Sequence, residues 1–250
     1  MKDNVAAERD GRRPLYRIAG YAAFTIALST ALWIVLAGLC FLTRVGQDPS
    51  GLEKVFPFIN GWGRFNLVGL VLLQVPVVIA LTTMTIGRQR MLAVLGATFG
   101  GLYVLAGLFA ALLKTVVFSD IAGRFLTVSG AEQAIAIRNL TIWAQGHPYA
   151  VTYGLDVPVN LLFALMAVCF AGALTTATVA ESAVKWLLAG GAVIGLVVSA
   201  TQLVGWSALQ GLLLVAAAAT IGAYLLLAPL FLAKAMGPSA EAETAVPVRS

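Results

Sequence analysis

Histidine occurs once in this chain of 250 residues, at His147, and cysteine occurs twice. One histidine cannot supply both axial ligands of a bis-histidine haem, nor a histidine-rich zinc site. The sequence also has no phosphate-binding loop, no dinucleotide-binding fingerprint and no nucleophile elbow. We therefore expect no cofactor, no metal site, no haem and no catalytic residue that can be named from a motif.

Charge is scarce as well. Only 11% of the residues are charged and 60% are hydrophobic, whereas soluble domains have roughly 25% charged residues. The 16 lysines and arginines are scattered over the ends of apolar runs and form no stripe, so we expect no nucleic-acid partner. This composition predicts an all-α membrane protein whose main partner is the lipid bilayer.

The long apolar runs predict six transmembrane helices, because a spanning helix needs about 20 apolar residues. The last uncharged run is too long for one helix and is split at Gly205-Trp206-Ser207. Before the first span lies a basic tail, residues 1–17, and after the last span a tail, residues 234–250, whose composition predicts disorder. The expected spans cover residues 18–43, 65–87, 91–113, 157–180, 186–204 and 212–233.

The distribution of basic residues predicts the orientation. The N-terminal tail and the short connection around Arg88 and Arg90 are basic, whereas the longer connections carry fewer lysines and arginines for their length. Since such residues favour the cytoplasmic side, we expect both termini in the cytoplasm and the protein in a bacterial cytoplasmic membrane.

Two long connections, residues 45–63 and 115–153, are expected on the outside. Each contains a capping-box spacing, Ser50 with Glu53 and Ser129 with Glu132, which is typical of a helix start. We expect one short interfacial helix in each. The first could instead act as a substrate gate, and the second as a lid.

No ionisable residue falls inside any of the six expected spans. Proton relays and carboxylate ion sites need such residues within the membrane, so the sequence argues against a proton-coupled pump.

Uncharged polar residues do occur within the spans. Gln74 in the second span and Ser199, Thr201 and Gln202 in the fifth predict either a polar pocket between these helices or hydrogen bonds between helices. Small residues four apart predict close helix packing, inside one chain or in a homo-oligomer. They are Gly96 with Gly100 and Gly191 with Gly195.

A third group of residues surrounds the expected start of the fourth span. Its members share one helical face or adjoin it, and predict a polar vestibule on the outer side. The alternative is that the tyrosines anchor the membrane interface while a lysine and an aspartate cap helix ends. The residues are Lys114, His147, Tyr149, Tyr153, Asp156 and Asn160.

Two short motifs suggest a relationship. Arg17-Ile18-Ala19-Gly20 opens the first span, and Ala131-Glu132-Gln133 is followed by His147-Pro148-Tyr149 before the fourth. In these features the chain resembles a bacterial family of uncharacterised six-helix integral membrane proteins, a domain of unknown function. The resemblance implies a six-helix fold and no activity.

Three functions are consistent with the sequence. The first, which the sequence favours over the two alternatives that follow, is a non-catalytic membrane module that assembles with or regulates a membrane-protein partner. The second is a facilitator or exporter of a neutral or lipophilic small molecule. The third is a membrane enzyme that acts on lipid at the outer face, with His147 and Asp156 as acid and base; their separation along the chain argues against it.

Overall fold

The computed structural model describes residues 2–42, 68–132, 135, 151–203 and 212–236. These residues form six helices, and the described part of the chain contains no strand, so the predicted all-α fold is confirmed there. The helices are α1 (Lys2–Leu42), α3 (Leu70–Thr85), α4 (Arg90–Thr127), α6 (Val151–Ala173), α7 (Val179–Leu203) and α8 (Leu212–Ala235).

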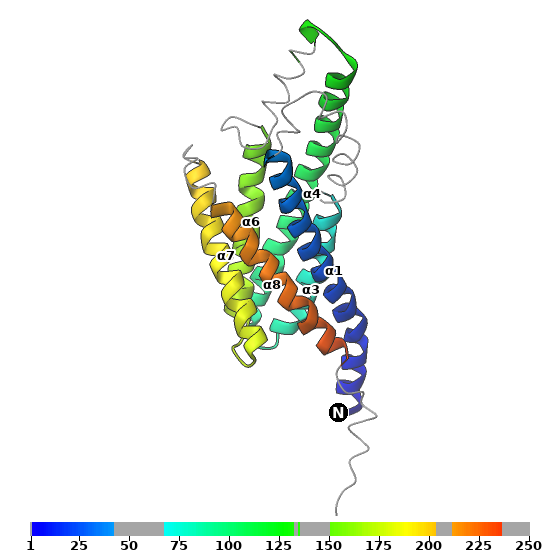
Figure 1. Cartoon of the computed structure of the whole chain (residues 1–250). Coiled ribbons are helices and arrows are strands. Elements are labelled where there is room, and N and C mark those ends of the chain that lie inside the picture. Colours follow the sequence, from blue (N-terminus) through cyan, green and yellow to red (C-terminus); the bar gives the residue numbers. More distant parts are fainter. Residues whose placement is uncertain (1, 43–67, 133–134, 136–150, 204–211, 237–250) are drawn as a thin grey trace, which may run out of the picture.

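Successive helices run in opposite directions, and α1 begins near the end of the bundle at which α8 ends (Figure 1). The short connections α3–α4 and α6–α7 lie at that same end. We call it the turn end, defined by residues 86–89 and 174–178.

Four helical segments are long and apolar enough to cross a membrane: Gly11–Leu32, Arg90–Leu113, Val179–Thr201 and Val215–Ala235. Two shorter apolar helices, Leu70–Thr85 and Val157–Ala173, accompany them. Large apolar side chains such as Leu105, Phe109 and Trp186 are exposed on the outside of the bundle. A surface of this kind suits lipid, and together these features support the prediction of a membrane protein.

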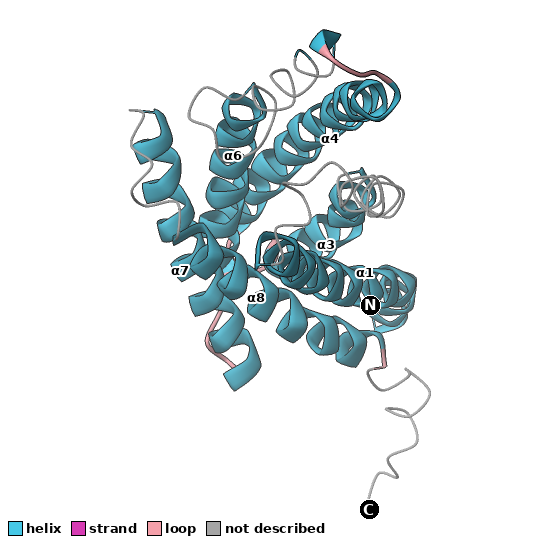
Figure 2. Cartoon of the chain, turned by 45° about the horizontal axis from the view of Figure 1, so that its top comes forward, coloured by secondary structure: helices cyan, strands magenta, loops and turns pink. Residues whose placement is uncertain are grey.

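The six helices form a ring in which each helix packs mainly on two neighbours, and α3 makes a few further contacts with α6 (Figure 2). The order around the ring is α1, α3, α4, α6, α7, α8 and back to α1. Small residues allow the close approaches: Gly20 of α1, for example, lies against Leu232 and the carbonyl oxygen of Ala228 in α8. Since lipid gives helices no hydrophobic reason to associate, such packing must supply much of their affinity.

Several expected boundaries are wrong. Residues 2–17, expected as a tail, belong to α1, and residues 115–127, expected in a loop, belong to α4. Charged residues such as Asp120 and Arg124 mark where the hydrocarbon should end. They do not stop a helix, which can continue into water.

The connection between α6 and α7 also differs from expectation. The fourth span was expected to reach residue 180 and the fifth to begin at residue 186, but α6 ends at Ala173 and α7 begins at Val179. Thr178 starts α7 by capping it, since the backbone N–H of Glu181 donates to Thr178 Oγ1 at 3.1 Å. Glu181 and Lys185 therefore lie in the first two turns of α7 and within the candidate span Val179–Thr201, whereas the fifth span was expected to begin after them.

The other expected features of the connections are described only in part. After α4, Gly130 adopts a φ of 65°, and Ala131 and Glu132 are helical. The rest of that predicted interfacial helix, the one expected within residues 45–63, the turn at 205–207 and the tail 237–250 lie outside the described residues.

Candidate functional site: two polar clusters in the helix ring

A hydrogen bond crosses the interior of the ring. Tyr224 of α8 donates its hydroxyl to Oε1 of Gln74 in α3, although α3 and α8 are not neighbours in the ring. Both side chains are buried, with 4% of Gln74 and 2% of Tyr224 exposed. We call these two residues the interior pair.

The interior pair lies near the middle of the expected membrane. Gln74 precedes the end of α3 at Thr85, and Tyr224 the end of α8 at Ala235, by a similar length of helix. At 1.5 Å per residue each is about 16 Å from the turn end, close to half of a hydrocarbon core about 30 Å thick. A polar side chain at that depth is costly unless it is hydrogen-bonded, and the two residues satisfy each other.

Aromatic and broken-helix features surround the interior pair. Tyr103 of α4 is close enough to Tyr224 for an electrostatic interaction, and its ring packs on Phe163 of α6 with centroids 5.3 Å apart. Pro76, two residues after Gln74, lies inside α3 and cannot donate a backbone hydrogen bond. The hydrogen bond to Tyr224 uses Oε1 of Gln74 and leaves the two N–H groups of its amide as further donors.

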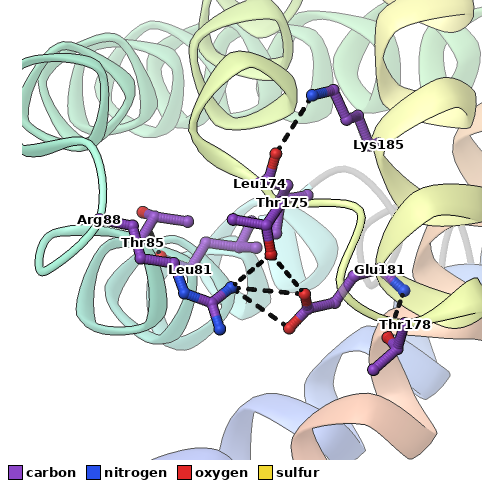
Figure 3. Close-up of polar contacts among 8 residues, drawn as sticks. All are labelled: Leu81, Thr85, Arg88, Leu174, Thr175, Thr178, Glu181 and Lys185. Carbon is purple, nitrogen blue, oxygen red and sulfur yellow. Dashed lines mark hydrogen bonds and ion pairs between the residues drawn. The ribbon is translucent and has the colours of Figure 1, made fainter.

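A second cluster closes the turn end (Figure 3). Arg88 Nη1 donates to Thr175 Oγ1 at 2.9 Å and lies 3.4 Å from both carboxylate oxygens of Glu181. Thr175 in turn donates its hydroxyl to Glu181 Oε2 at 2.8 Å. We call Arg88, Thr175 and Glu181 the turn-end cluster.

Local structure fixes each member of the turn-end cluster. The α3–α4 turn is held by the backbone N–H groups of Arg88 and Gln89, which both donate to the carbonyl oxygen of Thr85. On the other side, Lys185 Nζ donates to the carbonyl oxygen of Leu174 at 3.3 Å and ties α7 to the turn before it. Glu181 sits in the first turn of α7, where the helix dipole favours a negative charge.

The turn-end cluster is asymmetric in its exposure to water. Only 3% of Glu181 is exposed, whereas 39% of the Arg88 side chain is exposed. A buried carboxylate needs partners to offset its lost hydration, and Arg88 and Thr175 are the two side chains that supply them. Arg88, by contrast, can reach water without leaving its turn.

The predicted polar residues of the fifth span do not meet Gln74. Helices α3 and α7 are not neighbours in the ring. Thr201 donates to the carbonyl oxygen of Val198 in its own helix at 2.8 Å. Ser199 Oγ is buried without a hydrogen-bond partner among the described residues, and the Gln202 side chain lies outside them.

The structure describes little of the predicted outer vestibule. Lys114 lies on α4 and Tyr153, Asp156 and Asn160 lie on α6, two helices that pack together. Asn160 is half-buried, and the side chains of the other three are outside the described part, as are His147 and Tyr149 altogether.

The predicted packing glycines face other helices of the same chain. A Cβ atom on Gly96 would lie 3.0 Å from Phe170, and one on Gly100 would lie 2.8 Å from Val78. The corresponding distances are 3.4 Å from Gly191 to Ala219 and 3.8 Å from Gly195 to Ala164.

Neither the turn-end cluster nor Tyr224 was predicted from the sequence. Thr178 and Glu181 have the spacing of a capping box, the same signal that was used elsewhere, and it would have located the start of α7. No local signal identifies Tyr224 as the partner of Gln74, because a tyrosine within a span is usually interpreted as an interface anchor.

Comparison of the chain with protein-family models, with curated proteins and with solved structures gives no match.

Proposed function

We propose that this protein is a six-span membrane protein that allows an uncharged, hydrogen-bonding small molecule to cross the bilayer, as a facilitator or exporter. The observation that carries the proposal is the interior pair. Gln74 and Tyr224 come from α3 and α8, the two helices that flank α1, and their hydrogen bond lies about halfway along these helices, at the depth where transporters commonly bind their solutes.

The chemistry of the pair indicates the kind of solute. An amide and a phenol can exchange their mutual hydrogen bond for bonds to a solute, and neither carries a charge. Tyr103 and Phe163 add aromatic surface nearby. A neutral molecule with a carbonyl, hydroxyl or amide group suits such a site better than an ion, for which these residues offer no countercharge.

The proposed topology places the turn end in the cytoplasm of a bacterial cell. Among the residues whose side chains are described, basic groups lie near this end: Arg88 and Arg90 at the α3–α4 turn and the start of α4, Lys185 near the start of α7, and Lys234 in the last turn of α8. This agrees with the preference of lysine and arginine for the cytoplasmic side. We also propose that the chain belongs to the bacterial family of six-helix membrane proteins that it resembles.

Flux into proteoliposomes tests the function. We would measure uptake of a panel of neutral amides, alcohols and lactones by protein-containing and protein-free vesicles. Tyr224→Phe and Gln74→Leu should lower the flux of the best solute at least tenfold, whereas Tyr21→Phe, the same change at a 61% exposed tyrosine, should leave it unchanged. Equal flux in all four proteins would refute the role of the interior pair.

One observation favours a second function, a non-catalytic module that assembles with another membrane protein or with itself. Gly101 of α4 and Gly190 of α7 have no neighbouring atom within 4 Å of an added Cβ, so each leaves a shallow site on the outer surface for another helix. A stoichiometric protein that co-purifies in mild detergent, and is lost in Gly101→Leu or Gly190→Leu, would support this function.

A further inference from the structure

The turn-end cluster links two parts of the ring that are otherwise joined only through helix packing. Arg88 belongs to the α3–α4 turn, whereas Thr175 and Glu181 belong to the α6–α7 turn and the start of α7. Helices α4 and α6 pack along their lengths, but α3 and α7 are not neighbours. The cluster therefore connects the end of α3 to the start of α7, two helices that are not neighbours in the ring.

The cluster is more than a helix cap. Thr178 already caps α7 by accepting the backbone N–H of Glu181. In a capping box the glutamate side chain would return to the start of its own helix. Here the carboxylate of Glu181 is directed at Arg88 and Thr175 (Figure 3), so its contacts serve the connection between the turns.

Along α3, the cluster lies beyond the interior pair, toward the turn end. On α3, Leu81 and Thr85 are buried on the same face as Gln74 and lie seven and eleven residues closer to Arg88 along the helix. Leu174, beside Thr175, is buried in the same core. These buried side chains and the cluster therefore lie between the interior pair and the turn end.

We propose that Arg88, Thr175 and Glu181 form a latch that holds the turn end closed. When the two turns part, a path opens toward Gln74 and Tyr224. The role of this latch in solute access rests on the proposed function. The asymmetry of exposure suits this role. Arg88 already reaches water, and parting of the two turns would admit water to the carboxylate of Glu181, so hydration of both groups can replace the ion pair in the open state.

Cysteine labelling measures the latch without any solute. In a background with Cys40→Ala and Cys169→Ala, Leu81→Cys places a thiol between the latch and the interior pair. The probe is a charged, water-soluble maleimide added at the turn end of the purified full-length protein in proteoliposomes. Arg88→Gln and Glu181→Gln should each raise the labelling rate about tenfold, which corresponds to about 1.4 kcal/mol in the opening equilibrium.

The matched control is Arg90→Gln, which removes an exposed arginine from the same short connection and should leave the labelling rate unchanged. Thermal unfolding in detergent shows which variants are folded. If either latch variant fails to fold, Thr175→Val, which keeps both charges, should raise the labelling rate at least threefold.

Two results would overturn the latch: unchanged labelling in the folded latch variants, or an equal increase in Arg90→Gln. Labelling does not depend on transport, so the latch can be refuted while the proposed function stands, and the reverse. Flux that depends on Tyr224 with no change in labelling would leave the proposed function without a latch. Faster labelling in the latch variants, with no flux of any solute, would leave a closing device in a protein of another function.

Discussion

The hydrogen bond between Tyr224 and Gln74 gives a quantitative test of the structure. Tyr224→Phe removes the donor and keeps the ring, so the packing of α8 is retained while Gln74 stays 4% exposed without its partner. Leaving a buried polar group unpaired costs about 1–3 kcal/mol in proteins, and hydrogen bonds between transmembrane helices average about 0.6 kcal/mol. We expect Tyr224→Phe to lower the free energy of unfolding by about 1 kcal/mol.

The double variant separates this bond from general damage. Gln74→Leu also breaks the bond, but removing both partners together leaves nothing polar unpaired. Gln74→Leu/Tyr224→Phe should therefore be more stable than the sum of the single effects predicts, by about 0.6–1.7 kcal/mol.

The assay is reversible unfolding in mixed micelles of a mild detergent and an unfolding detergent, followed by tryptophan fluorescence. Tyr21→Phe serves as the control, since changes at exposed positions usually fall within about 0.5 kcal/mol. If the two single effects were additive within about 0.3 kcal/mol, Gln74 and Tyr224 would not interact, and the helix ring would be wrong in the register of α3 against α8.

Three further predictions use the same unfolding measurement. Arg88→Gln should destabilise the protein more than Glu181→Gln does, because it strands a buried carboxylate, whereas the latter leaves an arginine that reaches water; the opposite order would contradict the geometry of the turn-end cluster. Gly100→Leu should cost at least about 1–3 kcal/mol through overpacking, since even a Cβ would lie 2.8 Å from Val78, whereas a Cβ added at Gly101 meets nothing within 4 Å, so Gly101→Leu should be tolerated. Equal costs would count against the packing of α3 on α4. Thr178→Ala should cost about 1 kcal/mol by removing the cap of α7, while Thr176→Ala at an exposed neighbouring position should cost little, and the reverse order would move the start of α7.

The sequence was a good guide to which segments are apolar and a poorer one to where helices end. Apolar runs identify stretches that can lie in hydrocarbon, and α3, α4, α6, α7 and α8 each overlap an expected span. Charges were used as helix ends because they end the apolar run. Helix α4 continues through Lys114 and Asp120 to Thr127, since a charged residue outside the membrane is as compatible with a helix as any other.

The same reasoning explains why Glu181 was misplaced. A carboxylate was taken to mark a connection, but at the start of a helix it is stabilised by the dipole and, here, by Arg88 and Thr175. Arg88 thereby contacts Thr175 and Glu181, which lie 87 and 93 positions further along the chain. A pattern within one segment contains no information about such pairing.

The positions of the two polar clusters follow from what holds helices together in lipid. Small residues let the helices approach but discriminate weakly between one register and another, and Gly96 and Gly100 of α4 could accept several neighbours. A hydrogen bond between buried side chains does discriminate, because any slip of α8 against α3 leaves both Gln74 and Tyr224 unpaired. With the turn-end cluster fixing one end, and the interior pair lying about 16 Å away along the helices, the ring is fixed at two depths. Opening at the turn end can then leave the interior pair in place, and this is the property that a protein exposing a central site to one side of a membrane requires.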